Sequence, residues 1–478
     1  MHMDLASLAP ALPEIVLLAA ACAILVLDLF LTEQRRHLTY VLSLVALVAA
    51  VAATIWVGGG PREVVFHGNY VRDPMSDALK ISVFLVTLLG FVYSRGYLVA
   101  RRLFKGEFYV LGLFAALGMS VIASAASFLT AYLGLELLAL SLYALVAFDR
   151  NATAGSEAAM KYFVLGALAS GLLLYGMSMV YGATGALSFA TVGQRLAVQP
   201  ADQTVLVFGL VFIVIGIAFK FGAVPFHMWV PDVYHGAPAP VTLLVGSAPK
   251  IAAFALAFRL LSDGLGPLHP HWQGMLVLLA VASLALGNVV AIAQTNIKRM
   301  LAYSTISHVG FIFLGLLAGT PDGMAAAMFY AILYALMAAG AFGVIVLLSR
   351  EGVEAERIDD LKGLNQRSPW YAGMMLLLMF SMAGVPPTAG FFAKLFVLDA
   401  VVDVDMVWLA VFGVFFSVIG AFYYLRVIKV MYFDAPLDEA PLRAPADAMW
   451  VLSVNGLTML ALGLFPAGLL SICVAAVS

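Results

Sequence analysis

Four ionisable residues lie inside long apolar segments of this 478-residue chain: Glu136, Lys220, Lys250 and Lys394. A charged side chain inside a membrane costs about 2.5–3.5 kcal/mol on insertion scales, so such residues persist where they pair, line a wet cavity or relay ions. Because the four residues lie in separate segments, they predict a path for protons or cations through a bilayer. Opposite charges relieve each other's desolvation, and we therefore expect Glu136 and Lys220 to face each other.

Two local patterns extend this path. Lys250 follows Pro249, which loosens the helix backbone and could admit water. His308 ends the run Tyr303–His308, where hydroxyl side chains accompany a histidine that titrates near neutrality. We expect the predicted site of proton translocation to run through Glu136, Lys220, Lys250, His308 and Lys394.

Each of these residues also has a structural explanation. Glu136 could be a carboxylate bonded to a neighbouring Ser or Tyr, and each lysine could extend its ammonium group to the membrane interface. A lone histidine on an apolar helix is usually a hydrogen-bonded structural residue, so His308 could be one as well. The spatial arrangement of the residues distinguishes these explanations from a relay.

The composition indicates a polytopic membrane protein. Apolar residues make up 63% of the chain and charged residues only 11%, whereas an ordinary soluble domain has roughly 25% charged residues. Membrane lipids are therefore expected partners. The net charge of −2 argues against nucleic acid as a partner. Cys22 and Cys473 have no metal-ligand spacing, and a disulfide between them is not expected.

The long apolar runs predict an all-α fold. A spanning helix needs about 20 apolar residues, and the runs lack the alternation of a membrane β-barrel. The fourteen predicted spans are 13–32, 38–58, 76–96, 108–124, 127–147, 158–182, 203–221, 240–261, 273–294, 300–318, 323–348, 370–394, 406–431 and 449–474. The short connections predict a single membrane domain over residues 1–478.

Loop charges predict the orientation. Of the 25 Lys and Arg residues, 17 fall in odd-numbered loops, three in predicted helix interiors and five on the even-numbered side. Those five are Arg62, Arg72, Lys80, Arg195 and Arg259. By the positive-inside rule the odd-numbered loops face the cytoplasm, so both termini should lie on the periplasmic side.

Two of the predicted spans contain proline-rich interruptions. The seventh runs into Phe219–His227, which contains Pro225, and the twelfth contains Gly384–Gly390 with its Pro-Pro pair. Proline removes a backbone donor, so we expect both helices to be broken. The broken helix is fourth in each of two five-helix units, 108–262 and 272–431. Because five is odd, these units would be inverted repeats, preceded by three helices in 1–107 and followed by one in 449–478.

Two long motifs resemble a known family. The segments Phe226–Pro240 and Asn296–Gly310 are similar to the helix-seven-to-eight and helix-nine-to-ten junctions of the antiporter-like membrane subunits of respiratory complex I. The resemblance is greatest to the subunit N branch of that family. Lys394 argues against the subunit M branch, whose members carry a glutamate at this place in helix twelve. The lack of a long C-terminal extension argues against subunit L.

The resemblance implies a proton-translocating subunit of NADH:quinone oxidoreductase, a translocase of the bacterial inner membrane. It implies that Glu136 and Lys220 form a pair, that Lys250 is a relay lysine and that Lys394 is the helix-twelve lysine. No nucleotide, flavin or iron–sulfur motif is present in the sequence. FMN, iron–sulfur clusters and quinone are thus expected in partner subunits, with subunits M and K as neighbours.

Three other functions compete with this interpretation. A subunit of a multisubunit sodium/proton antiporter would share the same motifs. A passive scaffold would retain buried charges only for packing, but two matching lysine-bearing breaks argue against it. An open water-filled channel would need polar-lined stripes, which the Gly-, Ala- and Leu-rich segments lack.

Overall fold

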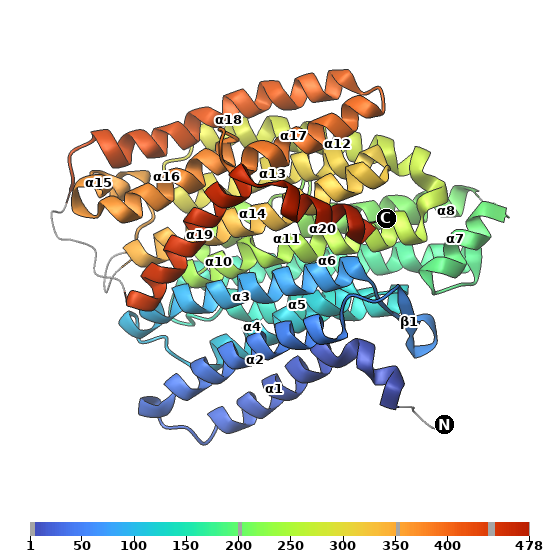
Figure 1. The fold of residues 1–478 in the computed structure, drawn as a ribbon, viewed down its shortest axis with the longest axis horizontal. Coiled ribbons are helices and arrows are strands. Elements are labelled where there is room, and N and C mark those ends of the chain that lie inside the picture. Colours follow the sequence, from blue (N-terminus) through green and yellow to red (C-terminus); the bar gives the residue numbers. More distant parts are fainter. Residues whose placement is uncertain (1–4, 199–202, 350–353, 438–444, 478) are drawn as a thin grey trace.

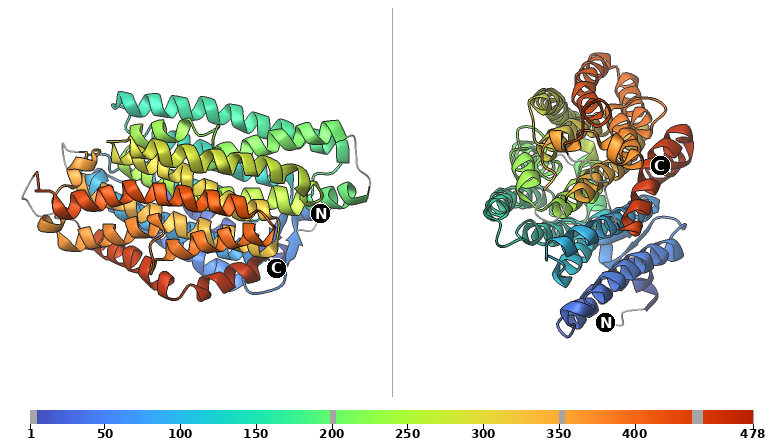
Figure 2. Two further views of the ribbon diagram at one scale, coloured as in Figure 1. Left: turned by 90° about the horizontal axis from the view of Figure 1, so that it is seen from above. Right: turned by 90° about the vertical axis from the view of Figure 1, so that its left-hand side faces the viewer.

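The computed structural model describes residues 5–198, 203–349, 354–437 and 445–477, which form a bundle of helices running side by side (Figures 1 and 2). The regular sheet in this part of the chain is one antiparallel hairpin of β1 (Glu63–Val65) and β2 (Tyr70–Arg72). Thirteen helical segments of the described chain are long and apolar enough to span a membrane.

The unbroken spanning helices agree with the predicted spans. They are α1 (Leu12–Asp28), α2 (His37–Val57), α3 (Pro74–Ala100), α4 (Gly106–Ala123), α5 (Phe128–Val146), α6 (Thr153–Thr184), α12 (His269–Ile292), α13 (Ile297–Ala318), α14 (Pro321–Leu348) and α18 (Val407–Phe433). Two further helices, α8 (Gln203–Phe221) and α19 (Ala446–Leu464), belong to interrupted spans. Shorter helices connect them: α7 (Phe189–Val198), α9 (Trp229–Gly236) and α15 (Leu364–Arg367).

The predicted break in the seventh span is present. Helix α8 ends at Phe221, and Gly222 follows with φ +78°, a left-handed conformation that glycine adopts without strain. The backbone N–H of Ala223 then donates to the carbonyl of Ala218 at 2.8 Å, the hydrogen bond of a Schellman helix end.

The twelfth span is broken in the same way, into α16 (Pro369–Ala383) and α17 (Ala389–Asp403). Gly384 has φ +84°, and the N–H of Val385 donates to the carbonyl of Phe380 at 2.9 Å. The two breaks therefore share one backbone design. Together α16 and α17 cover the twelfth predicted span, which adds one pass to the thirteen spanning segments given above.

Two further spans are interrupted where the sequence predicted continuous helices. The predicted helix 240–261 is α10 (Ala239–Gly246), α11 (Ala248–Ala257) and a π-helical turn, Phe258–Gly264, with a kink at Ser247 (φ −112°, ψ −95°). The predicted helix 449–474 is α19 followed by α20 (Ala467–Val477), because Pro466 at the junction has no N–H to continue the ladder.

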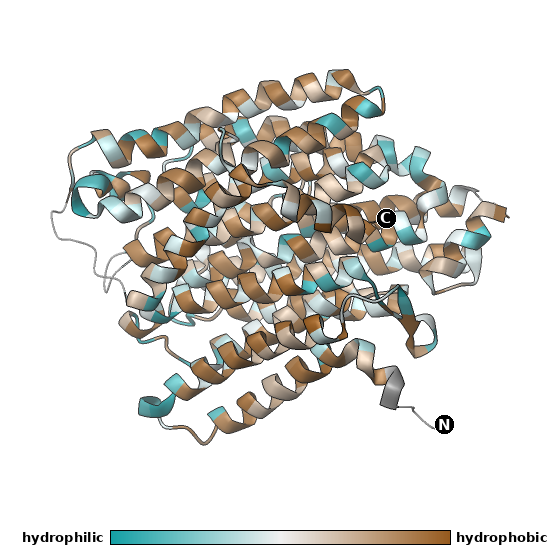
Figure 3. Cartoon of the chain, viewed as in Figure 1, coloured by the Kyte–Doolittle hydropathy of each residue, from teal (hydrophilic) through white to brown (hydrophobic). Residues whose placement is uncertain are grey.

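The core of the bundle lies around α10, α11, α13 and α14. The spans Ala239–Gly264 and Ile297–Ala318 are each 94% buried, whereas Val407–Phe433 is 33% buried. Apolar residues cover the length of the helices, and many hydrophilic residues gather at the two ends of the bundle (Figure 3). The outer helices therefore present apolar faces suited to lipid or to other membrane subunits.

Candidate functional site

Lys250 binds the end of the first broken helix. It lies in the first turn of α11, is 1% exposed, and donates from Nζ to the carbonyl of Phe221 at 2.7 Å. Its ammonium also lies 5.4 Å from the ring centroid of Trp229. The side chain is thus held inside the bundle, which excludes the interface explanation for this lysine.

A small cavity connects Lys250 with Lys220. The space in which the centre of a water molecule fits measures about 30 Å³. Tyr162 and Trp229 also line this cavity. A cavity of about 10–15 Å³ by this measure holds one water, so one or two waters fit between the two amines.

Glu136 and Lys220 are neighbours without a direct contact. Nζ of Lys220 donates to Oγ of Ser170 at 3.2 Å, and its charge interacts with that of Glu136. No ion pair within 4.0 Å joins these two described side chains, and the buried Oε1 of Glu136 has no hydrogen-bond partner among the described residues. The expected direct pair is therefore replaced by a longer-range electrostatic contact.

His308 lies in a hydroxyl-rich cluster between α13, α14 and α18. Its Nδ1 lies 2.7 Å from the hydroxyl of Tyr330, and its Nε2 lies 3.0 Å from that of Tyr424. The Tyr424 hydroxyl also lies 2.5 Å from Oγ of Ser304. The histidine is thus hydrogen-bonded, as the structural explanation requires, but its partners are hydroxyl groups that both donate and accept.

Lys394 binds the end of the second broken helix. Its Nζ donates to the carbonyl of Ala383, the last residue of α16, at 2.8 Å and to Oγ of Ser417 at 2.9 Å. Its charge interacts with His308, and its Nζ lies 5.1 Å from the ring centroid of Phe311. Lys394 and Lys250 therefore bind equivalent backbone positions at the two breaks.

An amide in α12 joins this part of the site and was missed by the sequence interpretation. Nδ2 of Asn288 donates to Ser307, and its Oδ1 accepts from Tyr423 at 3.0 Å. An Asn inside an apolar span is itself a signal for such a network, because an unsatisfied amide is costly there.

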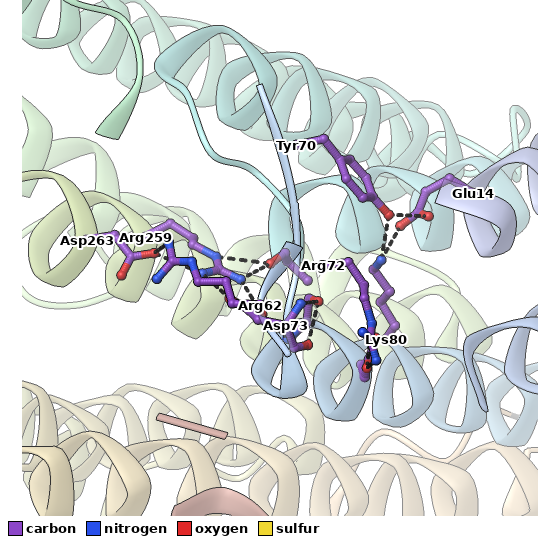
Figure 4. Close-up of polar contacts among 11 residues, drawn as sticks. Glu14, Arg62, Tyr70, Arg72, Asp73, Lys80, Arg259 and Asp263 are labelled. Atoms are coloured by element: carbon purple, nitrogen blue, oxygen red, sulfur yellow. Dashed lines mark hydrogen bonds and ion pairs between the residues drawn. The ribbon is translucent and has the colours of Figure 1, made fainter. Parts of the chain in front are cut away.

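Two charges counted on the even-numbered side are buried in helical segments at the end of the bundle near β1. Nζ of Lys80 in α3 lies 2.9 Å from Oε1 of Glu14 in α1 and donates to the hydroxyl of Tyr70 at 2.8 Å (Figure 4). The sequence interpretation counted Lys80 on the even-numbered side, and the residue lies about two turns into α3, within the predicted span 76–96.

Arg259 was likewise counted on the even-numbered side and is 1% exposed. Its guanidinium donates to both carboxylate oxygens of Asp73 at 2.8 Å, to Asp263 at 2.8 Å and to the carbonyl of Ala123 (Figure 4). This bidentate arrangement ties the π-helical turn after α11 to the start of α3 and the end of α4.

The opposite end of the bundle carries a loop-to-helix ion pair. Oε1 of Glu356 lies 3.2 Å from Nζ of Lys298, and its Oε2 lies 3.7 Å from Nε2 of His235. The neighbouring His235, aided by the charge of Lys298 and opposed by burial, lowers the pKa of Glu356 to about 2. The loop is therefore anchored to α13 and to α9.

No cluster of three or more His, Cys, Asp or Glu residues suited to a metal ion occurs in the described part of the chain. The five residues predicted from the sequence form two groups, with Glu136, Lys220 and Lys250 near the first break and His308 and Lys394 near the second.

The comparisons with known proteins identify the family. The family model described as "NADH:quinone oxidoreductase/Mrp antiporter, TM" matches residues 125–420. NADH-quinone oxidoreductase subunit N of Thioalkalivibrio sulfidiphilus is 60% identical over 479 residues, which cover 100% of both chains. The chain belongs to the NADH-quinone oxidoreductase subunit N family.

Other subunit N proteins and solved structures agree with this family. The subunit N of Thiobacillus denitrificans is 57% identical over 100% of this chain and 99% of its own. A chain of respiratory complex I from Thermus thermophilus is similar with a TM-score of 0.83 and 31% identity, covering 97% of this chain and 100% of that one. A chain of the Mrp complex from Dietzia sp. has a TM-score of 0.88 at 21% identity, covering 99% and 97%, and so shares the fold.

Membership of the subunit N family confirms two predictions from the sequence: the resemblance to antiporter-like subunits of complex I and the all-α, multi-span membrane fold. The roles of the five site residues, the inverted relation of the two five-helix units and the direction of the termini stay predictions.

Proposed function

We propose that this subunit N family member moves protons across the bacterial inner membrane as part of NADH:quinone oxidoreductase, through Glu136, Lys220, Lys250, His308 and Lys394. The observation that carries the proposal is the pair of lysines, Lys250 and Lys394, buried on equivalent carbonyls at two broken helices. Pairing a titratable amine with an interrupted helix is the design expected of an ion-transfer site at membrane depth.

Each residue has a separate task in this proposal. Glu136 sets the electrostatic potential at Lys220, and the small cavity allows water to carry a proton from Lys220 to Lys250. His308 and its tyrosine hydroxyls extend the path, and Lys394 ends it in the second unit. The matching break geometry supports the proposed inverted repeats, 108–262 and 272–431.

A partner subunit is part of the proposal because Glu136 lies on a half-exposed face of α5. Leu133 and Leu140 on that face are 67% and 56% exposed. A carboxylate beside lipid is costly at membrane depth, so a neighbouring subunit should cover it. We propose that the neighbours include subunits M and K. FMN, iron–sulfur clusters and quinone would belong to partner subunits. Redox reactions in those subunits would then drive proton movement through this chain.

The experiment is purification of the complex in mild detergent, identification of the partner chains and measurement of NADH oxidation and proton transfer in vesicles. The Lys250→Met variant should assemble and oxidise NADH but move fewer protons per NADH than the parent. A chain that co-purifies only with sodium/proton antiporter subunits, without NADH oxidation, would refute the proposal in favour of the antiporter alternative.

A further inference from the structure

A second cavity, unconnected with the proposed relay, opens between three helices at the bundle end opposite β1. Its volume is about 360 Å³ by the measure used above, whereas one water needs about 10–15 Å³ by that measure, so a small organic group fits. Its lining comes from the last turn of α1, the first half of α4 and the end of α5: Leu25, Lys105, Glu107, Val110, Leu111, Phe114, Ala144, Ala147, Phe148 and Arg150.

The cavity combines a charged rim with an apolar wall. Lys105 directly precedes α4, Glu107 lies in its first turn and Arg150 follows the end of α5. The wall is made by residues such as Leu111 and Phe114, one and two turns deeper along α4. The charges therefore lie where a spanning helix leaves the membrane, and the wall continues toward the hydrocarbon.

The three rim charges are not used by the fold. The side chains of Lys105, Glu107 and Arg150 are exposed and have no hydrogen bond or ion pair to any described residue. Arg36, another cation at this end, differs in that it donates to the carbonyl of Phe104. The cavity thus presents two free cations and one free carboxylate to whatever enters it.

We propose that this cavity binds the head group of a phospholipid that carries both a phosphate and a primary ammonium group, as phosphatidylethanolamine does. Lys105 and Arg150 provide donors for the phosphate oxygens, and Glu107 accepts from the ammonium. The acyl chains follow the apolar wall formed by α4 and its neighbours. Basic pockets between spanning helices are general binding sites for lipid phosphate.

Glu107 decides between classes of ligand. A lipid whose head group is only anionic, such as phosphatidylglycerol, would meet repulsion from this carboxylate, and a soluble phosphate would gain nothing from Leu111 and Phe114. A zwitterionic aminophospholipid satisfies the two cations, the carboxylate and the wall together.

The test is native mass spectrometry of the full-length chain, purified in mild detergent and titrated with phosphatidylethanolamine or phosphatidylglycerol. The Lys105→Gln/Arg150→Gln double variant should bind phosphatidylethanolamine roughly tenfold more weakly, which corresponds to about 1.4 kcal/mol. Glu107→Gln should also weaken phosphatidylethanolamine binding while leaving phosphatidylglycerol unchanged or stronger. Arg35→Gln, an exposed cation at the same end outside the cavity, is the matched control and should bind like the parent.

Two outcomes would overturn the proposal. Tighter binding of phosphatidylglycerol than of phosphatidylethanolamine, strengthened further by Glu107→Gln, would make this an anionic-lipid site. Equal binding of both lipids to the parent, to the variants and to Arg35→Gln would show that no head group is recognised here and leave the face to a partner subunit. The substituted side chains are exposed, so elution and thermal unfolding like those of the parent exclude misfolding.

Discussion

Nζ of Lys80 lies 2.9 Å from Oε1 of Glu14, and the two residues are 0% and 7% exposed. The pair joins α3 to α1, and Tyr70 of β2 completes it through hydrogen bonds to both partners. A buried ion pair of this kind holds the first helix against the rest of the bundle at the β1 end (Figure 4).

Breaking this pair should be more harmful than replacing it. Removing one partner of a buried ion pair leaves an uncompensated charge and costs about 3–5 kcal/mol. We therefore expect Lys80→Met or Glu14→Gln to lower the unfolding temperature in detergent strongly. The double variant Glu14→Leu/Lys80→Met should recover most of the loss. A double variant as unstable as the sum of the single ones would contradict this account.

Glu136 and Lys220 should act together through their electrostatic contact. Glu136→Gln or Lys220→Met should reduce proton transfer in vesicles containing the assembled complex, because each removes one member of the coupled pair. The double variant should lose less than the sum of the two losses, since coupled residues are non-additive. Full proton transfer by either single variant in an intact complex would rule out the coupling.

Lys394→Arg tests whether Lys394 carries a proton or only a charge. A guanidinium stays protonated, so this variant keeps the charge but resists releasing a proton. We expect it to assemble and to move about as few protons per NADH as Lys394→Ala does. Proton transfer at the parental ratio would mean that the charge alone is sufficient.

The lowered pKa of Glu356 predicts that the stability of its loop falls at acid pH. Its pKa in the folded chain is about 2, lower than in the unfolded chain. Its contribution is therefore complete above about pH 4.3, the ordinary glutamate value, and is lost as the pH falls toward 2. Glu356→Gln should be less stable than the parent at neutral pH and flatten this acid decline, measured by thermal unfolding. The exposed Glu63→Gln should leave the parental pH profile unchanged.

The orientation of the chain can be tested with reporter fusions. The loop charges predict that the α3–α4 turn and the loop after α14 lie in the cytoplasm and that the C-terminus lies in the periplasm. Arg72, Lys80 and Arg259 of the even-numbered side are buried, and so is Lys298 of the odd-numbered side. Leaving out these four charges makes the asymmetry stronger. A periplasmic reporter signal from the α3–α4 turn would reverse the assignment.

The spans could be predicted because a run of about twenty apolar residues is enough to identify a spanning helix. The two proline breaks could be predicted because a missing backbone N–H interrupts the helix at the proline itself. The ion-pair partners of Lys80 and Arg259 could not be predicted, because Glu14 and Asp73 are distant from them in sequence. Both cations also lie close to a helix end, where an exposed charge is common. Pro249 indicated a loosened backbone, but the kink lies two residues earlier, at Ser247, because a proline is tolerated in the first turn of the helix that follows. Lys250 and Lys394 were found as buried amines, but their carbonyl partners depend on how the helices pack.

Lys250 and Lys394 can hold the two helix ends whether or not they carry an extra proton. An ammonium group has three N–H bonds, and a neutral amine keeps two, so the bond to the carbonyl of Phe221 or Ala383 survives in both states. Deprotonation replaces one of the remaining N–H bonds with a lone pair, so at that position the nitrogen changes from a hydrogen-bond donor to an acceptor. A chain of water molecules that ends at such a nitrogen would reverse its polarity while the backbone stays in place.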